Sequence, residues 1–274
     1  MYYQLVRFSL PVVLCGALLV GCKQSMTVST STGTTNTTAS NTTTESAEVA
    51  PTEVPMKEKV KSNYADSVVR HAVFFSFKET STKEDVQSVA DAFAGLPNDI
   101  PEIIDFQWGE NNSPEDHDHG FTHCFLLTFA DEAGRDVYLP HMAHKAFGDV
   151  LRPHMADVFV IDYFGKAGDS GIKKELKHCV FFKFADDASA MDVKKVEDAF
   201  ADLPNKIDAI KHFEWGKNHS PEKHDDGFTH CFMVSFDSEE GREAYLPHAD
   251  HMAFVDVLKP VLDKVRVLDF WETK

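Results

Sequence analysis

The sequence predicts an α+β protein built from two ferredoxin-like repeats, each with the element order β-α-β-β-α-β, packed face to face as an intramolecular dimeric α+β barrel. Residues 71–164 match residues 178–271 at about 50 of 94 positions, 107 residues further along and without insertion or deletion. This period is about the size of a small domain and is too long for a solenoid repeat. Within each copy, short runs rich in Val and Phe alternate with segments of helical spacing.

The first strand and helix of the repeat are predicted from periodicity. Residues 71–77 are rich in Val and Phe, and strand alternation places every second residue, from His71 onward, on one face. A helix is expected to begin near Thr82, where Asp85 follows at the spacing of a capping box. Apolar residues then recur at helical spacing until Leu96, which precedes a proline.

The remaining elements follow in the order of the ferredoxin-like arrangement. They are a strand at 103–108, a polar loop from 111, a strand at 121–129, helices at 132–138 and 141–151, and a strand at 158–163. The same order is expected 107 residues later, after a linker at 165–176. The predicted folded domains therefore span 64–164 and 177–274.

A sheet of this kind carries helices on only one of its faces. If Val73 and Phe75 point away from the helices, another apolar surface must bury them, and the second repeat supplies an identical one. The expected product is a monomer that contains an internal pseudo-dimer of its two repeats.

The N-terminal region is predicted to be a targeting segment and a tether. Residues 1–22 contain Arg7, an apolar run and a Leu-Val-Gly-Cys ending that resembles a bacterial lipobox. The resemblance implies a lipoprotein signal peptide, with Cys22 lipidated and inserted into the lipid bilayer. Residues 23–63 form a Ser/Thr-rich segment that we expect to be disordered, since it has no apolar pattern. The expected location is the cell envelope, lipid-anchored to the outer membrane or facing the periplasm.

Composition narrows the classes of partner. The formal net charge of -17 argues against nucleic acid as a partner. Beyond the signal peptide and its final cysteine, three cysteines remain: Cys124, Cys179 and Cys231. We expect Cys124 and Cys231, which lie in apolar strands, to be buried free thiols.

Five motifs recur in order in both copies. A His opens the first strand, Trp-Gly closes the second, Gly-Phe-Thr-His opens the third, Tyr-x-x-His-x-x-His follows, and Asp-Tyr or Asp-Phe closes the last strand. This series resembles the stress-responsive A/B barrel (Dabb) domain, over residues 70–164 and 177–271. The resemblance implies dimeric α+β barrels, most of them without an assigned activity. One member, a plant polyketide cyclase, uses a first-strand His, a Tyr and the last His of the Tyr-x-x-His-x-x-His motif around an apolar pocket.

The resemblance places candidate catalytic residues in both repeats. They are His71, Tyr138 and His144, and His178, Tyr245 and His251. The side chains expected to line the pockets are Val73, Phe75, Phe93 and Phe125, and Val180, Phe182, Phe200 and Phe232. The cyclase has a pocket Tyr on its first helix where this chain has Phe93 and Phe200, a difference that argues against identical chemistry.

A neutral imidazole can remove a proton beside a carbonyl, and a phenol can stabilise the enolate that forms. The alternative is structural: these residues cap a short helix and bond to the polar loop. A single His in an apolar strand, such as His123 or His230, is more simply a core residue bonded to a neighbour.

Metal binding is the other alternative. His141 with His144, and His248 with His251, are three residues apart, and His117, His119 and His123 lie near acidic residues of the polar loop. No tight ligand signature is present, so the sequence assigns no metal residues and no cofactor; haem stays open as a third alternative.

Two functional hypotheses follow. The favoured one is a binding module: an envelope lipoprotein whose pockets hold a small apolar or metal-containing ligand. The second is a cyclase or lyase that uses a His/Tyr pair for proton transfer.

Overall fold

The structure is a computed structural model that describes residues 66–168 and 170–273. The predicted signal peptide, Cys22 and the predicted tether lie outside the described residues. In the first repeat the elements are β1 (Ser67–Phe77), α1 (Lys83–Ala94), α2 (Leu96–Asp99), β2 (Ile103–Glu110), β3 (His123–Phe129), α3 (Glu132–Tyr138), α4 (Met142–Leu151) and β4 (Met155–Lys166). In the second repeat they are β5 (Leu176–Phe184), α5 (Ala190–Ala201), η1 (Leu203–Asn205), β6 (His212–Lys217), β7 (His230–Phe236), α6 (Glu239–Tyr245), α7 (Ala249–Leu258), η2 (Lys259–Val261) and β8 (Leu262–Trp271).

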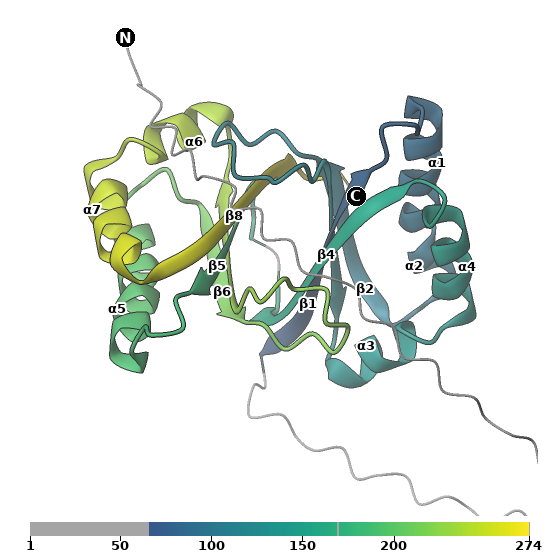
Figure 1. Cartoon of the computed structure of the whole chain (residues 1–274), viewed down its shortest axis with the longest axis horizontal. Helices are drawn as coiled ribbons and strands as arrows, with labels where there is room; N and C mark the ends of the chain where they lie inside the picture. Colours follow the sequence, from purple (N-terminus) through teal and green to yellow (C-terminus); the bar gives the residue numbers. More distant parts are fainter. Residues whose placement is uncertain (1–65, 169, 274) are drawn as a thin grey trace, which may run out of the picture. The chain divides into compact units, whose positions relative to one another are not determined.

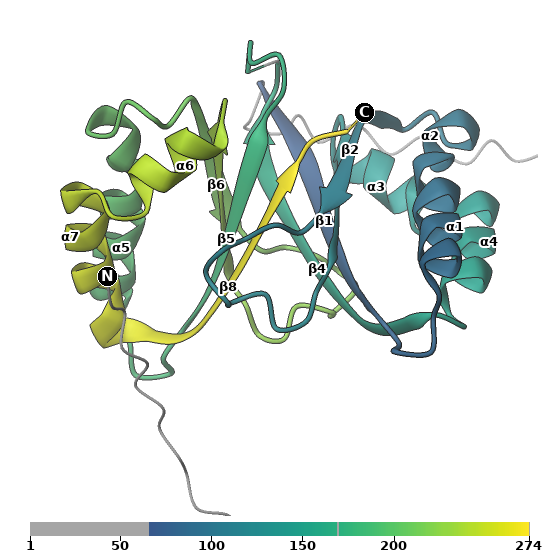
Figure 2. The ribbon, with the colours of Figure 1, turned by 90° about the horizontal axis from the view of Figure 1, so that it is seen from above.

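Each repeat forms one four-stranded antiparallel sheet. The strand order is β2-β3-β1-β4 in the first repeat and β6-β7-β5-β8 in the second. This is the predicted ferredoxin-like arrangement, in which each helix crossover joins strands that are not neighbours. The two sheets lie at the centre, with α1, α2 and α4 outside the first and α5 and α7 outside the second (Figure 1, Figure 2). The predicted fold class, two repeats packed as an internal pseudo-dimer, is confirmed.

Capping side chains fix where the helices begin. Thr82 Oγ1 accepts a hydrogen bond from Asp85 N (3.1 Å), and Asp85 Oδ2 accepts one from Thr82 N (2.9 Å), which completes the expected capping box. Ser189 caps α5 in the same position, while Asp131 and Ser238 cap α3 and α6. Within the two described ranges, no helix combines the length and the apolar character needed to cross a bilayer.

The helices cover the sheet face that carries Val73 and Phe75. Phe75 lies 5.9 Å from Phe93 of α1 and 6.2 Å from Phe147 of α4, measured between ring centroids. The conditional expectation that Val73 and Phe75 point away from the helices is therefore wrong. Both faces of β1 are apolar, so alternation separates the two faces without revealing which one the helices cover.

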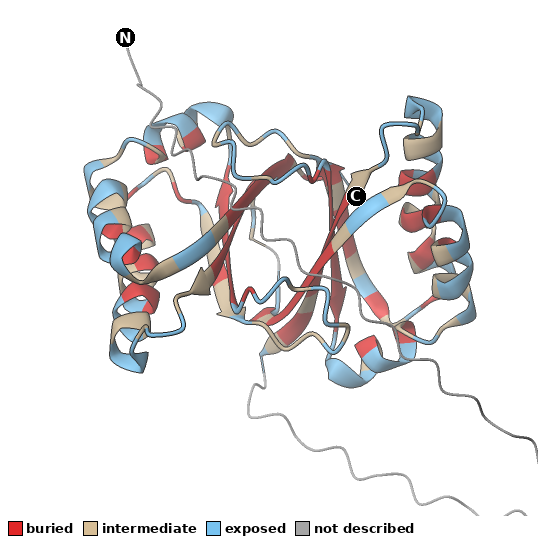
Figure 3. Cartoon of the chain, in the orientation of Figure 1, coloured by how far each residue is buried: buried red, intermediate tan, exposed pale blue. Residues whose placement is uncertain are grey.

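The opposite face of each sheet packs against the other repeat. Phe74 lies 5.2 Å from Phe181, and Phe159 lies 5.0 Å from Phe181 and 5.3 Å from Phe228. The three cysteines of the described residues are free and buried, as expected for Cys124 and Cys231. Buried residues lie along the strands of both sheets and on the sides of the helices that face the sheets (Figure 3).

The loops that precede β3 and β7 cross to the opposite repeat. In loop 218–229, His219 N donates to Asp162 O (3.0 Å), and Val160 N donates to His224 O (2.9 Å), so the loop pairs with the edge of β4. Loop 111–122 pairs with β8 in the same manner, since Asn112 N donates to Asp269 O (2.8 Å). Each loop thus covers an edge strand that would otherwise expose unpaired backbone groups.

We expect Phe181→Ala to lower the free energy of unfolding by about 3–5 kcal/mol, since it leaves a cavity between the two sheets. Urea denaturation followed by circular dichroism measures the loss. Met191→Ala, at a side chain that is 67% exposed, is the matched control and should cost about 0.5 kcal/mol or less. A loss of under about 1 kcal/mol for Phe181→Ala would show that the sheets do not depend on each other.

Candidate functional site

Each repeat encloses a cavity between its helices and its sheet. The first pocket, of about 240 Å³, is bounded by β1, β4, α1 and α4 and has mostly apolar walls. Its polar lining residues are His71, Tyr138, His144, Arg152, Glu222 and His224. The second pocket, also about 240 Å³, lies at the equivalent place in the second repeat. The structure thus brings the three predicted catalytic residues of each repeat together in one cavity.

His71 is held by a carboxylate on the neighbouring strand. The β1–β4 pairing places His71 directly opposite Asp162, and His71 Nδ1 lies 2.6 Å from Asp162 Oδ1. Asp162 Oδ2 in turn accepts a hydrogen bond from Arg135 Nη1 (3.0 Å). Burial lowers the pKa of His71, but the charge and hydrogen bond of Asp162 outweigh it, and the pKa lies above its ordinary value.

Tyr138 is buried beside His71 with its hydroxyl unpaired. The ring centroids of His71 and Tyr138 lie 5.6 Å apart, and Tyr138 is 0% exposed. Its hydroxyl has no hydrogen-bond partner among the described residues. Burial, with a further contribution from the charge of Glu222, raises the pKa of Tyr138 well above its ordinary value. The phenol is therefore a neutral donor available to a ligand.

His144 stacks on Tyr138 with a ring-centroid distance of 4.2 Å. Its Nδ1 lies 3.0 Å from the carbonyl oxygen of Leu139, which can only accept, so Nδ1 carries the proton and Nε2 has a free lone pair. Burial lowers the pKa of His144 more than the Leu139 bond raises it. His144 is therefore a neutral imidazole at pH 7.

A glutamate of the opposite repeat completes the first pocket. Glu222, from the crossing loop 218–229, places Oε2 3.6 Å from His71 Nε2. This oxygen is buried without a hydrogen-bond partner in the described chain. The sequence interpretation did not include Glu222; the available signal was the triplet Ser-Pro-Glu, which ends at Glu115 and at Glu222 in otherwise polar loops.

The second pocket repeats this geometry. Asp269 accepts hydrogen bonds from His178 Nδ1 (2.7 Å) and from Arg242 Nη1 (2.8 Å). The ring centroids of His178 and Tyr245 lie 5.6 Å apart, and those of Tyr245 and His251 lie 4.2 Å apart. His251 Nδ1 lies 2.8 Å from the carbonyl oxygen of Leu246. Glu115, from loop 111–122, places Oε2 3.7 Å from His178 Nδ1. Both sites therefore contain the same set of six residues: two His, and one each of Asp, Arg, Tyr and Glu.

Most of the residues expected to line the pockets do so. Val73, Phe75 and Phe93 line the first pocket, and Val180, Phe182 and Phe200 line the second. Phe125 and Phe232 do not. Phe125 stacks behind Phe93 at 4.4 Å, and Phe232 stacks behind Phe200 at 4.3 Å. They support the pocket wall from the core.

Three of the other histidines, His141, His123 and His230, form structural hydrogen bonds. His141 caps α4, with Nδ1 accepting from Ala143 N (3.2 Å), and His144 turns into the pocket, so these two side chains do not share a ligand. His123 bonds to Thr122 and His230 to Glu197, as expected for core histidines. No group of three or more His, Cys, Asp or Glu side chains within 66–168 and 170–273 is arranged to hold a metal ion.

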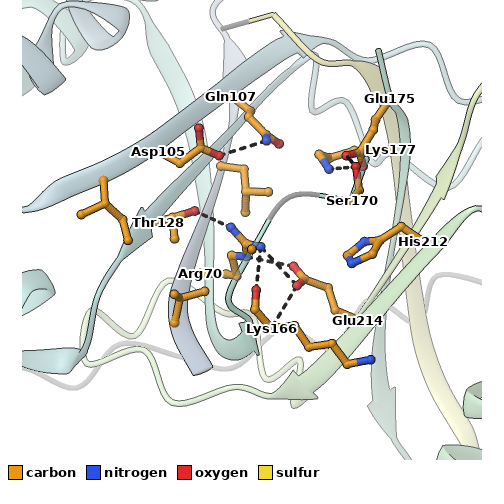
Figure 4. Close-up of a pocket in the computed structure, with 14 residues that line it drawn as sticks. Arg70, Asp105, Gln107, Thr128, Lys166, Ser170, Glu175, Lys177, His212 and Glu214 are labelled. Atoms are coloured by element: carbon orange, nitrogen blue, oxygen red, sulfur yellow. Dashed lines mark hydrogen bonds and ion pairs between the residues drawn. The ribbon is translucent and has the colours of Figure 1, made fainter. Parts of the chain in front are cut away.

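A third cavity, of about 290 Å³, lies between the two sheets and contains none of the predicted site residues (Figure 4). Four of its charged side chains form two ion pairs. Arg70 Nε bonds to Glu214 Oε1 (3.0 Å), and Lys177 Nζ bonds to Glu175 Oε2 (2.6 Å). A ligand here would have to compete with ion pairs that are already formed.

The pockets beside the helices combine groups suited to proton transfer. One imidazole has its pKa raised by a carboxylate, another has its pKa lowered by burial, and a neutral phenol lies between them. Titratable groups whose pKa values are displaced in opposite directions are typical of an acid and a base. The mostly apolar walls give these groups surroundings less polar than water, which strengthens the polar contacts among them.

Comparisons with known proteins agree with the fold. A family model described as Stress responsive A/B Barrel Domain matches residues 69–164 and 176–272. The chain is 35% identical over 101 residues to the stress-response A/B barrel domain-containing protein HS1 of Arabidopsis thaliana, covering 37% of this chain and 93% of that protein. It is 30% identical over 95 residues to olivetolic acid cyclase of Cannabis sativa, covering 35% of this chain and 94% of the cyclase. The crystal structure of an anthrone oxidase-like protein has a TM-score of 0.51 at 10% identity, covering 76% of this chain and 92% of that one; this likeness concerns the fold alone.

We expect the stability loss caused by His71→Gln to be larger at pH 5.5 than at pH 9. Because the pKa of His71 is raised in the folded state, its protonation stabilises the fold fully below its ordinary pKa of 6.5. That contribution disappears as the pH rises through the raised pKa. Urea denaturation of the variant and the parent across this range measures the difference.

His144→Gln is the contrasting control. Because the pKa of His144 is lowered, its contribution is present above its ordinary pKa and is lost as the pH falls. The loss for this variant should therefore grow with pH. If the His71→Gln loss is independent of pH, the charged His71–Asp162 pair is contradicted.

Proposed function

We propose that this chain, which belongs to the stress-responsive A/B barrel domain family, binds a small, largely apolar carbonyl compound in each pocket and catalyses proton transfer at the carbon beside the carbonyl. The proposal is based on three groups that lie together at the polar end of an apolar cavity. They are the imidazole of His71 bonded to a carboxylate, the unpaired buried phenol of Tyr138 and the neutral imidazole of His144. The relative from Cannabis sativa is named a cyclase, which agrees with this class of chemistry.

The geometry supports different roles for the two imidazoles in this proposal. His144 Nε2 has a free lone pair and takes the proton from the carbon. Negative charge then develops on the carbonyl oxygen. The Tyr138 hydroxyl and the Nε2–H of protonated His71 donate hydrogen bonds to that oxygen, as in an oxyanion hole. In a cyclase step, the enolate carbon attacks a second carbonyl carbon of the same ligand, a C–C bond forms, and the new alkoxide takes the proton from protonated His144. In a lyase step, the enolate re-forms its carbonyl and a new C=C bond as a leaving group departs from the next carbon with that proton.

The apolar wall indicates the shape of the ligand. Phe93 and Phe147 stack at 4.5 Å and, with Phe75, present aromatic surface to the first pocket. The cyclase resemblance expects a hydroxyl on the first helix, but Phe93 offers none. We infer a ligand that is aromatic or alkyl on this side, with its oxygens confined to the end near His71.

We also propose that the chain is an envelope lipoprotein anchored through Cys22. The support is the sequence alone: an apolar run that ends in Leu-Val-Gly-Cys, followed by a Ser/Thr-rich stretch that would act as a tether. Because the two repeats form an internal pseudo-dimer, a single tethered chain would carry both pockets as a monomer.

We expect the His144→Gln/His251→Gln variant to lose proton transfer by about 10²–10⁴-fold, the usual contribution of a general base. The measurement is hydrogen–deuterium exchange at the α-carbon of 1-hydroxy-1-phenylpropan-2-one in D₂O, followed by NMR. His154→Gln, outside both pockets, should exchange at the parent rate.

Binding of this ketone with no exchange in the parent would support a binding module in place of an enzyme. An exchange rate that the double variant leaves unchanged would exclude His144 and His251 as the bases. Absence of both binding and exchange across a panel of aryl and alkyl ketones would refute the proposed ligand class.

We expect Cys22→Ala to move the protein from the membrane fraction to the soluble fraction and to abolish incorporation of labelled palmitate. Cell fractionation and labelling in a bacterial host measure both. Cys15→Ala, inside the apolar run, is the matched control and should leave anchoring intact. Membrane retention and labelling of the Cys22→Ala variant would disprove the anchor.

A further inference from the structure

We propose that each pocket is completed in trans: Glu222 of the second repeat and Glu115 of the first are substrate-contacting residues, each binding a hydroxyl hydrogen of a substrate held by the other repeat. The inference rests on the proposed function and names its substrate class, a small hydroxy carbonyl compound or the enol of a dicarbonyl.

The carboxylate of Glu222 lacks a hydrogen-bond donor on its buried oxygen in the described part of the chain. Glu222 Oε2 is buried and has no hydrogen-bond partner among the described residues, although the side chain as a whole is 25% exposed. A buried carboxylate oxygen without a donor is costly. The nearest cation is His71, but 3.6 Å is longer than a good hydrogen bond. The position beside Glu222 therefore suits an added hydroxyl, which would donate its hydrogen to the carboxylate, while the Nε2–H of His71 stays available for the carbonyl oxygen of the same ligand.

The loop that carries Glu222 is anchored to β4 of the first repeat. Asn218 Oδ1 accepts from Asp162 N (3.2 Å), so the residue that orients His71 also anchors the loop that carries Glu222. Lys223 and Asp226, on the C-terminal side of the glutamate, have φ angles of 61° and 50°. Residues other than glycine adopt this left-handed conformation at a cost, which persists where the surroundings require it. The carboxylate is therefore presented by a loop of defined shape.

Loop 111–122 is built in the same way, except that Glu115 lies nearest Nδ1 of its histidine, whereas Glu222 lies nearest Nε2. Asn111 Oδ1 accepts from Asp269 N (2.9 Å), and Asp116 and His119 have φ angles of 57° and 53°. Glu115 Oε2 is likewise buried without a partner, 3.7 Å from His178. The two loops are identical at 9 of 12 positions, and each delivers its glutamate to the opposite repeat. This agreement indicates a built site in each pocket.

Together, Tyr138, His71 and Glu222 suit a ligand that carries both a carbonyl oxygen and a hydroxyl group. The Tyr138 phenol and the protonated His71 both donate, and they suit the carbonyl oxygen of the ligand. Glu222 is the acceptor that matches a hydroxyl hydrogen. A site built to bond a substrate hydroxyl rejects the analogue that lacks it by about 10⁴–10⁵-fold, since its own polar group is left unpaired.

Paired substitutions test whether the glutamate acts in trans. His71→Gln/Glu222→Gln alters one pocket only, so about half of the α-proton exchange of 1-hydroxy-1-phenylpropan-2-one should survive, since the two pockets share one geometry. His71→Gln/Glu115→Gln alters both pockets and should lower the rate by at least about 10²-fold. The two variants carry the same residue changes and are matched controls for each other. Circular dichroism and thermal unfolding confirm that both fold.

Phenylacetone, which lacks the hydroxyl, tests the role of the carboxylate. The parent should prefer the hydroxy ketone, and Glu115→Gln/Glu222→Gln should lower exchange of the hydroxy ketone more than that of phenylacetone. Equal losses for the two ketones, or no loss, would overturn the contact with the hydroxyl. If His71→Gln/Glu222→Gln abolishes exchange while His71→Gln/Glu115→Gln keeps half, each glutamate serves its own repeat and the inference is wrong.

Ligand binding separates this inference from the proposed function. If the parent binds the hydroxy ketone without exchange, the catalytic proposal fails, and the stoichiometry still tests the glutamates. NMR titration should then give two sites in the parent, one in His71→Gln/Glu222→Gln and none in His71→Gln/Glu115→Gln. A parent that binds other ketones of the panel but not the hydroxy ketone refutes this inference alone, and a parent that binds no ketone of the panel refutes both proposals.

Discussion

Each four-stranded sheet has one apolar face that its own helices do not cover, and burial of that face against the other repeat is the interaction on which the rest of the structure depends. Phe74, Phe159 and Phe181 form the centre of the contact. Without it, about half of the strand side chains of each repeat would face water. The contact also brings the long loops within reach of the opposite sheet, where they pair with β4 and β8. Neither pocket is complete until the two sheets meet.

Because side chains alternate along β1, one face of the strand contacts the other repeat and the opposite face lines the pocket. Along β1, Ala72 and Phe74 face the other sheet, while His71, Val73 and Phe75 face the helices and the pocket. The β1–β4 register then sets His71 opposite its carboxylate, so the strand pairing that builds the sheet also orients the imidazole. One strand therefore supplies the inter-repeat contact, the pocket wall and a candidate catalytic residue. A shift of one residue in the β1 pairing register would turn each of these side chains to the opposite face of the sheet.

Much of this arrangement could be predicted from one sequence, because the duplication is itself an internal alignment. The element order follows from periodicity, and the motifs that persist in both copies include His71, Tyr138 and His144. The side of the sheet that faces the helices could not be predicted, since both faces of β1 are equally apolar. Glu222 could not be assigned either. A loop glutamate is usually solvated, and only the crossing of the loops, which no local pattern encodes, turns it inward.

The cavity between the sheets has a consequence for how the chain avoids wrong pairing. Arg70 is matched there by Glu214, but the position equivalent to Glu214 in the first repeat is Gln107. Two first repeats from neighbouring chains, packed in the same manner, would set each guanidinium against an amide. Arg70 would keep its hydrogen bonds to Thr128 Oγ1 and Lys166 O but would lose the carboxylate that neutralises its largely buried charge. A first repeat therefore gains less from packing against another first repeat than from packing against a second repeat.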